Sequence, residues 1–158
     1  MKITFTPVSE ENIDIAVAAY GSTRELELAG VSWSAEQKIA FIRMQFNAQK
    51  MDYQSRFPEA VHSVIEVDGQ PAGRIYMARL ADSLRILDIT ILPEKRNTGA
   101  GTQIIKDLMA EAKTSGKAVR IYVESFNPSL HLFERLGFVP VEERGVHLLM
   151  EWKNAEAG

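Results

Sequence analysis

The chain has 158 residues, of which 46% are hydrophobic and 25% are charged, and its formal net charge at pH 7 is -3. This length and composition are those of one globular domain that can bury a core, so a single domain over residues 1–158 is expected. The small negative charge gives no electrostatic reason to expect binding to nucleic acid or to an anionic membrane, and the absence of cysteine excludes disulfides, thiolate nucleophiles and cysteine-based zinc sites.

The N-terminal sequence MKITFTPVSEEN lacks the apolar core of a signal peptide. Elsewhere, no segment approaches the roughly 20 apolar residues that a spanning helix needs. We therefore expect a cytoplasmic protein with no membrane partner.

The first third of the chain predicts one strand and two helices. Residues 2–6 alternate as a short strand does, and Ser9 is predicted to cap a helix that ends before Gly30. Ser34–Gln37 has the capping-box spacing and opens a second helix that ends before Pro58. The predicted inward residues are Ile13, Val17 and Tyr20 in the first helix and Ile39, Ile42, Phe46, Tyr53 and Phe57 in the second.

The rest of the chain reads as strands and helices in alternation. Asp68-Gly69 predicts a hairpin turn between two strands, and residues 84–92 form an apolar run typical of a strand buried on both faces. The remaining predicted elements are a helix that closes at Ser115-Gly116, a strand over 118–125, a short helix over 127–137 and a terminal hairpin around Arg144-Gly145.

The glycine-containing loop after residue 92 joins a strand to a helix and then to another strand, and this βαβ arrangement predicts a parallel strand pair. Ligands of such units gather at the carboxyl ends of the strands, here Leu92 and Glu124. Gly99 and Gly101 permit positive φ, and the N–H groups that open the helix suit a phosphate. The alternative is a plain strand-to-helix turn. The Rossmann and P-loop patterns both fail, because Ile104 replaces a glycine and Thr102 replaces a lysine.

The segment Arg96-Asn97-Thr98-Gly99-Ala100-Gly101 resembles the coenzyme A pyrophosphate loop of the GNAT superfamily of acyltransferases. The segment NPSLHLFERLGF, residues 127–138, is similar to that superfamily's Asn and Tyr-x-x-Leu-Gly-Phe signature. The resemblance covers residues 2–152 and implies an α/β (α+β mixed) GNAT-like fold. Its central sheet of about six or seven strands would be mixed and mostly antiparallel, with a parallel, splayed central pair and about four flanking helices.

The resemblance implies acetyl-CoA as the acyl donor and no metal. In the family, the backbone of the strand before the loop pairs with the pantetheine arm of coenzyme A, and the loop binds its pyrophosphate. An Asn hydrogen-bonds the pantetheine side of the same cofactor. Asn127 could equally cap the helix ahead of Pro128. The cofactor-binding residues that this implies are Ile89, Thr90, Ile91, Arg96, Asn97, Thr98, Gly99, Ala100, Gly101, Thr102, Asn127 and Phe133. The same resemblance suggests the Ile91-Leu92 backbone N–H groups as oxyanion donors.

Phe133 occupies the position where the family frequently has a Tyr that serves as general acid near the thioester sulfur. Phenylalanine keeps the packing and loses the proton donor. Tyr122 is one substitute and Tyr76 another, although both also read as ordinary strand aromatics. For the general base we expect Glu124, at the carboxyl end of its strand, with a solvated strand-end charge as the alternative interpretation.

Two further carboxylates, Asp88 and Glu66, are alternative bases. The three histidines lack the spacing of a metal site and are interpreted as surface or packing residues.

The predicted function is N-acetyl transfer from acetyl-CoA to a primary amine. Direct transfer is expected, because the chain has no cysteine nucleophile. The alternative is a non-catalytic acyl-CoA-binding module, a sensor or partner subunit, in which Phe133 marks a degenerate active site. The acceptor is left open between a small amine, a peptide N-terminus and a protein lysine, and a homodimer is compatible with the fold.

Overall fold

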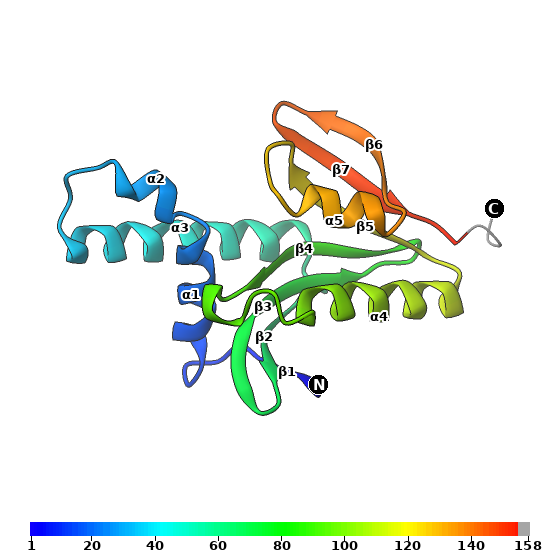
Figure 1. The fold of residues 1–158 in the computed structure, drawn as a ribbon, viewed down its shortest axis with the longest axis horizontal. Coiled ribbons are helices and arrows are strands. Elements are labelled where there is room, and N and C mark those ends of the chain that lie inside the picture. The colour runs from blue at the N-terminus through cyan, green and yellow to red at the C-terminus, as the bar shows by residue number, and fades with distance from the viewer. Residues whose placement is uncertain (155–158) are drawn as a thin grey trace. The chain divides into compact units, whose positions relative to one another are not determined.

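The computed structural model of the chain describes residues 1–154 (Figure 1), and their contacts divide the chain into two compact units. Unit 1 comprises Met1–Tyr76 with Ile89–Ala100, and unit 2 comprises Met77–Asp88 with the residues from Gly101 onward. The single domain expected over residues 1–158 stays a prediction, and its residues 155–158 lie outside the described part.

The seven strands form one mixed sheet in the order β1-β2-β3-β4-β5-β7-β6. β4 (Ser83–Ile91) pairs with β5 (Ala118–Glu124) in parallel, whereas β1 with β2, β5 with β7, and β6 with β7 pair antiparallel. The parallel register runs from Ser83↔Ala118 to Ile86↔Ile121, and both strands continue beyond that last pair. The predicted GNAT-like fold class is confirmed.

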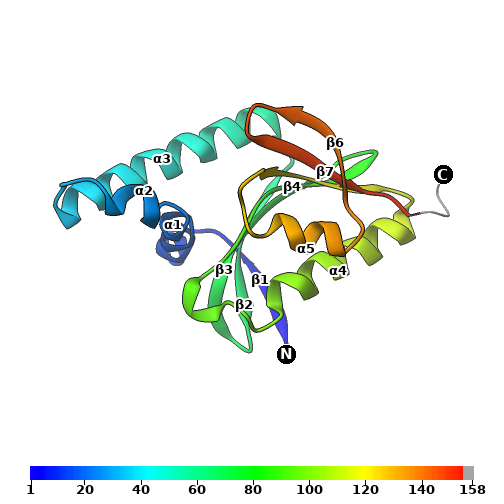
Figure 2. The same ribbon diagram turned by 45° about the horizontal axis from the view of Figure 1, so that its top comes forward.

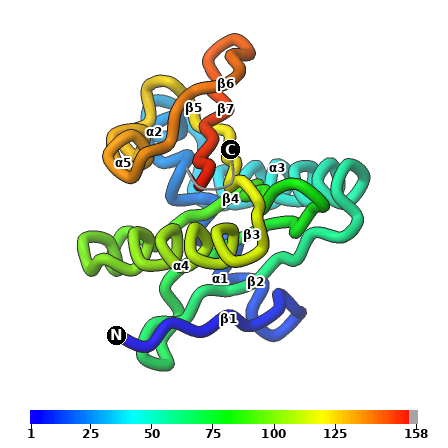
Figure 3. Tube along the Cα trace, turned by 90° about the vertical axis from the view of Figure 1, so that its right-hand side faces the viewer, coloured from blue at the N-terminus to red at the C-terminus, as the bar shows by residue number. Residues whose placement is uncertain are grey.

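Unit 1 contains a hairpin and three helices. Its elements are β1 (Ile3–Pro7), α1 (Ile13–Ser22), α2 (Glu25–Ala29), α3 (Ala35–Arg56), β2 (Val61–Val67), most of β3 (Gln70–Arg79), the end of β4 and the 3-10 turn η1 (Pro93–Lys95). β1 lies along β2 at one edge of the sheet (Figure 3). The predicted Asp68-Gly69 turn is confirmed, with φ of 51° and 81° at its two residues. α1 and α3 pack through Ala16, Tyr20 and Phe46.

The first predicted helix is wrong in two respects. Its cap is not Ser9, because α1 begins at Ile13 after Asn12, and the Asn12 side chain accepts a hydrogen bond from Ser9 N instead of capping the helix. The helix is also divided, into α1 and α2. At the break the Thr23 hydroxyl donates to Tyr20 O at 2.6 Å, and such side-chain bonds compete with the helical ones. Residues 1–154 therefore contain five α-helices, where about four were expected.

The second predicted helix is confirmed as α3, and its capping box is formed by Ser34 and Gln37. Phe46 is buried and Ile42 packs beside it against α1. Ile39 is the exception, since it is 54% exposed where the pattern placed it inward.

Unit 2 contains α4 (Ala100–Ser115), whose first residue belongs to unit 1, followed by β5, α5 (Leu130–Arg135), β6 (Val139–Arg144) and β7 (His147–Trp152). The terminal hairpin of β6 and β7 follows α5 (Figure 2). α4 buries Ile104, Ile105, Leu108 and Ala112. Arg79 and Glu111 join the end of β3 to α4 through two hydrogen bonds of 2.7 and 2.9 Å.

Candidate functional site

The loop between β4 and α4 is held in shape by its own side chains. The Thr98 hydroxyl donates to Lys95 O at 3.0 Å, and Arg96 Nε donates to Ile91 O at 3.1 Å. Arg96 also reaches the Ser22 hydroxyl of α1, at 3.4 Å. The residues from Arg96 to Gly99 are exposed. The loop is therefore an ordered structure that solvent can reach.

Positive φ occurs in this loop at Asn97 (64°) and Gly99 (86°). Gly101 does not use the positive φ that a glycine permits, because α4 begins at Ala100 and Gly101 lies in its first turn. Asn tolerates the left-handed region better than other side chains, which explains why Asn97 can take it. Gly101, like Thr102, instead contributes to the N-terminal turn of a 16-residue helix, whose first N–H groups lack helical partners.

The space above Gly99 is open. A Cβ built there would have no heavy atom of the described chain within 4 Å, apart from the adjacent residues. Beside the loop is a hollow of about 380 Å³, lined by Met1, Val67, Asp68, Gln70, Lys95 and Thr98. At its rim, Lys95 Nζ donates to the Gln70 side-chain oxygen at 2.7 Å. An anionic ligand could approach the loop without displacing protein atoms.

The end of β4, predicted to pair with pantetheine, lies against β3 within unit 1. A Cβ on Gly73 would stand 2.1 Å from Thr90 O, so only glycine permits this approach of the two backbones. Leu92 N donates to Ala72 O at 2.8 Å, which takes Leu92 out of the predicted role of oxyanion donor. Gly73 was not predicted as a functional position, although a lone glycine inside an apolar strand signals close backbone approach.

Asn127, predicted to contact the cofactor, has a structural role in unit 2. Its side-chain oxygen accepts hydrogen bonds from the backbone N–H and the hydroxyl of Ser129, each at 2.9 Å. Its own N–H donates to Glu124 O at 2.9 Å. The side chain thus fixes the turn that leads into α5. The alternative prediction that Asn127 caps this helix is wrong, because α5 begins at Leu130 directly after Ser129. Asn127 as a whole is exposed.

Phe133 is a core residue of unit 2. It is 3% exposed, and its ring meets that of Phe138 edge to face, with the centroids 5.4 Å apart. Aromatic pairs favour this arrangement. Phe133 therefore performs the packing that the Tyr-x-x-Leu-Gly-Phe signature implies and offers no proton.

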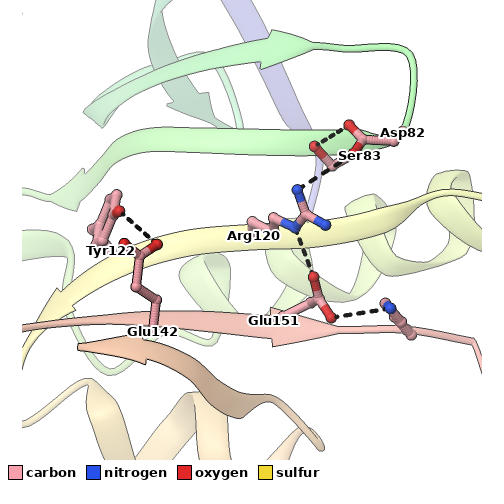
Figure 4. Close-up of polar contacts among 7 residues, drawn as sticks. Asp82, Ser83, Arg120, Tyr122, Glu142 and Glu151 are labelled. Atoms are coloured by element: carbon pink, nitrogen blue, oxygen red, sulfur yellow. Dashed lines mark hydrogen bonds and ion pairs between the residues drawn. The ribbon is translucent and has the colours of Figure 1, made fainter.

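Tyr122, the predicted substitute acid, is held by charged residues from two other strands. Its hydroxyl donates to the Glu142 carboxylate of β6 at 3.3 Å (Figure 4). The Arg85 guanidinium of β4 lies 4.7 Å from the centre of its ring. Arg144 in turn binds Glu142 at 2.6 Å. The hydrogen bond from Arg144 holds the pKa of the Glu142 carboxyl below its usual value, with a smaller contribution from Tyr122.

Figure 4 also shows a second charged group on the same strand. Arg120 binds Glu151 at 2.6 Å and Asp82 at 3.4 Å. This group is fully paired within unit 2 and explains why Glu151 can be buried on β7.

Glu124 lies opposite His147 in the β5–β7 register, and its carboxylate is 3.8 Å from the imidazole of His147. Both side chains remain partly exposed. The arrangement brings the predicted base beside a second proton-binding group. Of the alternative bases, Glu66 accepts a hydrogen bond from the Thr6 hydroxyl across the β1–β2 pair and is thereby engaged in the sheet edge.

Unit 1 contains a buried polar cluster that the sequence analysis did not single out. Arg74 on β3 is fully buried, and it donates to His62 Nε2 at 3.1 Å and to the Gln49 side chain at 3.0 Å. Burial, aided by the Arg74 charge, lowers the pKa of His62 to about 3. The His62 ring stacks on Tyr76 with the centroids 4.5 Å apart, and burial raises the pKa of the Tyr76 phenol, which makes Tyr76 a weaker proton donor.

Among residues 1–154, no group of three His, Asp or Glu side chains is placed to hold a metal ion. Over that same range, no helix combines the length and the hydrophobicity needed to cross a membrane.

The sequence profile described as "Acetyltransferase (GNAT) domain" matches residues 31–150 of the chain. Solved structures add a likeness of fold. PaiA N-acetyltransferase from Thermoplasma acidophilum, in complex with coenzyme A, is 20% identical, with a TM-score of 0.70 over 98% of this chain and 100% of that one.

Two further solved structures give the same picture. An acetyltransferase from Thermus thermophilus is 16% identical, with a TM-score of 0.68 over 98% of each chain. The ribosomal-protein-S18-alanine N-acetyltransferase from Escherichia coli is 16% identical, with a TM-score of 0.61 over 96% of this chain and 94% of that one. No curated protein sequence matches at a significant level.

Proposed function

The chain belongs to the GNAT family of acetyltransferases, which are acyl-CoA N-acyltransferases, and on that premise we propose that it transfers an acetyl group from acetyl-CoA directly to a primary amine. The observation that carries the proposal is the loop between β4 and α4. It combines the family's Arg-x-x-Gly-x-Gly pattern with two residues of positive φ and the N-terminus of a 16-residue helix.

The loop fits the pyrophosphate of coenzyme A. Phosphate oxygens need converging N–H donors and positive charge, and the first turn of α4 together with Arg96 supplies both. The open space above Gly99 is where the pyrophosphate would lie, and a side chain there would occupy it. We assign the pyrophosphate to the backbone from Arg96 to Thr102.

The other cofactor contacts are proposed from the family resemblance. The backbone of Ile89, Thr90 and Ile91 would bind the pantetheine arm, and the side-chain amide of Asn127, an exposed residue, would donate to it as well. Phe133 would shape the cofactor site from within the core of unit 2. Acetyl-CoA supplies the activated thioester, and no metal is needed for this chemistry.

An amine attacks the thioester only after losing a proton, because it is cationic in neutral water. Glu124 is the proposed base, and its proximity to His147 gives the proton a second group to reach. Direct transfer follows from the lack of any cysteine for a covalent intermediate. Much of the rate would then come from holding the amine against the acetyl carbonyl.

A second candidate function is favoured by Phe133, which buries a phenyl ring where the family frequently has a phenol. On this reading the chain binds acetyl-CoA without transferring the acetyl group, as a sensor or partner subunit. Catalysis can be retained without the phenol, because the group that leaves is the thiolate of coenzyme A. A thiol has a pKa of about 8.5, so its leaving depends less on protonation than that of an alkoxide would.

Thiol release from acetyl-CoA, read with a disulfide dye, separates the two functions. The dye reports only the product thiol, because the protein contains no cysteine. We expect release that depends on an added amine, tested with panels of small amines, peptides with free N-termini and peptides with internal lysines. The panel that supports turnover identifies the acceptor class. Acetyl-CoA binding without release for any panel would establish the non-catalytic module.

A further inference from the structure

We propose that Glu142 is the positioning residue of a proton relay, in which Tyr122 takes a proton from the attacking amine and passes its own to the Glu142 carboxylate. The inference rests on the proposed function and deepens it, because it assigns the proton path within the same site. Tyr122 was expected at the site from the sequence, whereas Glu142 was not.

The relay is formed by contacts from three strands of unit 2. The Tyr122 hydroxyl of β5 donates to Glu142 Oε2 of β6 at 3.3 Å, so its hydrogen is directed toward the carboxylate. The phenol oxygen can therefore accept a hydrogen bond from another group. The Arg85 guanidinium of β4, 4.7 Å from the ring centre, restrains the ring from a second direction.

A β-bulge explains why Glu142 can reach Tyr122. Along β6, Pro140 pairs with Met150 but the next β7 residue, Leu149, pairs with Glu142, so Val141 is the extra residue. Leu149 in turn pairs with Tyr122 on β5. The bulge thus puts Glu142 in one row with Leu149 and Tyr122, on one face of the sheet. Bulges are frequent near active sites, where they redirect a side chain.

The environment of Glu142 suits transient proton storage. Arg144 binds its Oε1 at 2.6 Å, while the hydroxyl of Tyr122 binds its Oε2. The Arg144 hydrogen bond holds the pKa of Glu142 below its usual value, so the carboxylate is ionised at neutral pH and returns a proton to water readily. The side chain is 38% exposed, which gives the proton that exit.

Glu124 takes the first proton, which the cationic amine loses before attack, and the relay takes the second. In the proposed step the neutral amine nitrogen bonds to the acetyl carbon, and the carbonyl π electrons move onto oxygen. The nitrogen, now positively charged and more acidic, loses a proton to the Tyr122 oxygen. The original Tyr122 proton moves to Glu142, which leaves Tyr122 neutral. Collapse of the oxyanion then breaks the carbon–sulfur bond and releases the thiolate of coenzyme A, and Glu142 gives its proton to solvent.

The test is a double-mutant cycle with Tyr122→Phe and Glu142→Gln, measured on the wild-type enzyme's best amine. Each single variant should lower kcat about 10²-fold, at the low end of the range for general acid–base catalysis, with KM for acetyl-CoA unchanged. The double variant should be no slower than either one, because both changes interrupt one path. Glu143→Gln is the matched control. It makes the same chemical change one residue along, at an exposed position paired with Leu148, and should keep full activity.

Losses that multiply in the double variant, or an unchanged kcat in either single variant, would overturn the relay. Thermal unfolding of each variant excludes misfolding as the cause of a loss. Turnover by the wild type with an unaffected Glu142→Gln variant would refute the relay alone. Absence of turnover with every amine would refute both the relay and the proposed function.

Discussion

At Gly73 the backbones of β3 and β4 approach each other closely within unit 1. An added Cβ would lie 2.1 Å from Thr90 O and 3.0 Å from Ile91 Cα, and both of these are backbone atoms that cannot rotate away. We expect Gly73→Ala to lower the free energy of unfolding by about 1–3 kcal/mol, as overpacking does, and to weaken acetyl-CoA binding by displacing the strand that would hold pantetheine.

Urea unfolding and calorimetric titration measure the two effects. Gly30→Ala is the control, because φ there is -86° and nothing lies within 4 Å of the added carbon. A Gly73→Ala variant as stable as Gly30→Ala would contradict the close approach.

A substitution at Gly99 tests whether the loop between β4 and α4 binds the cofactor. With φ at 86°, a side chain at this position should cost about 1–2 kcal/mol of backbone strain. Gly99→Ala should therefore reduce stability and also weaken acetyl-CoA binding, since the methyl group enters the space assigned to pyrophosphate. Gly116→Ala carries comparable strain, with φ at 68° and open space around it, but lies at the other end of α4. Equal affinity in the two variants would remove the loop from the cofactor site.

Because burial keeps His62 in its neutral form, we expect the protein to become less stable in acid. Its pKa is about 3 in the folded chain, chiefly through burial, against an ordinary value of 6.5. Between these values the unfolded chain binds a proton that the folded chain does not. The free energy of unfolding therefore falls as pH drops from 6.5 toward 3, by at most about 1.4 kcal/mol per pH unit from this group.

Replacing the imidazole isolates this contribution from the carboxylates that titrate in the same range. Urea midpoints of a His62→Gln variant should depend less on pH between 6.5 and 3 than those of the wild type. His131→Gln changes an exposed histidine of α5 and should leave the slope as it was. Parallel curves for the wild type and His62→Gln would show that the buried imidazole is not the source.

At the scale of elements, the start of α3 offers the clearest test of local sequence control. The Ser34 hydroxyl accepts from Gln37 N at 3.1 Å, and the Gln37 side chain accepts from Ser34 N at 2.9 Å. Ser34→Ala removes one half of this capping box and should cost about 1 kcal/mol of stability. Ser9→Ala, at the position where capping was predicted but is not found, should cost less. Equal losses in urea unfolding would mean that the box does not stabilise α3.

The elements also show where local patterns stop being sufficient. Alternating and apolar runs predicted all seven strands, and the parallel pair followed from the helix between its two members. The break between α1 and α2 was not predicted, because the sequence does not show that the Thr23 hydroxyl donates a hydrogen bond to the Tyr20 carbonyl. The place of Glu142 was not predicted either. A single bulge residue in β6 reverses the face of every residue after it, and the sequence of an exposed edge strand does not mark where the bulge falls.

For the molecule as a whole, one part of the candidate site could be predicted from the sequence and the other parts depend on contacts in the folded chain. The loop from Arg96 to Gly101 has a sequence pattern of its own, so both its position and its helix N-terminus were predicted. The surroundings of Tyr122 depend on residues of three strands that lie far apart in the sequence, and no local pattern connects them. Gly73 carried a local signal, a glycine within an apolar strand, but its neighbour at Thr90 is defined only by the folded chain.

The proposed cofactor site is tested most directly by a calorimetric titration of the wild-type protein with acetyl-CoA and with free coenzyme A, repeated with Gly99→Ala. We expect micromolar binding of both ligands with favourable enthalpy, and weaker binding by the variant. The two ligands should bind alike, because the pyrophosphate and pantetheine contacts are common to both. No heat at millimolar ligand would contradict the assignment of the loop to pyrophosphate and, with it, the proposed acetyl transfer.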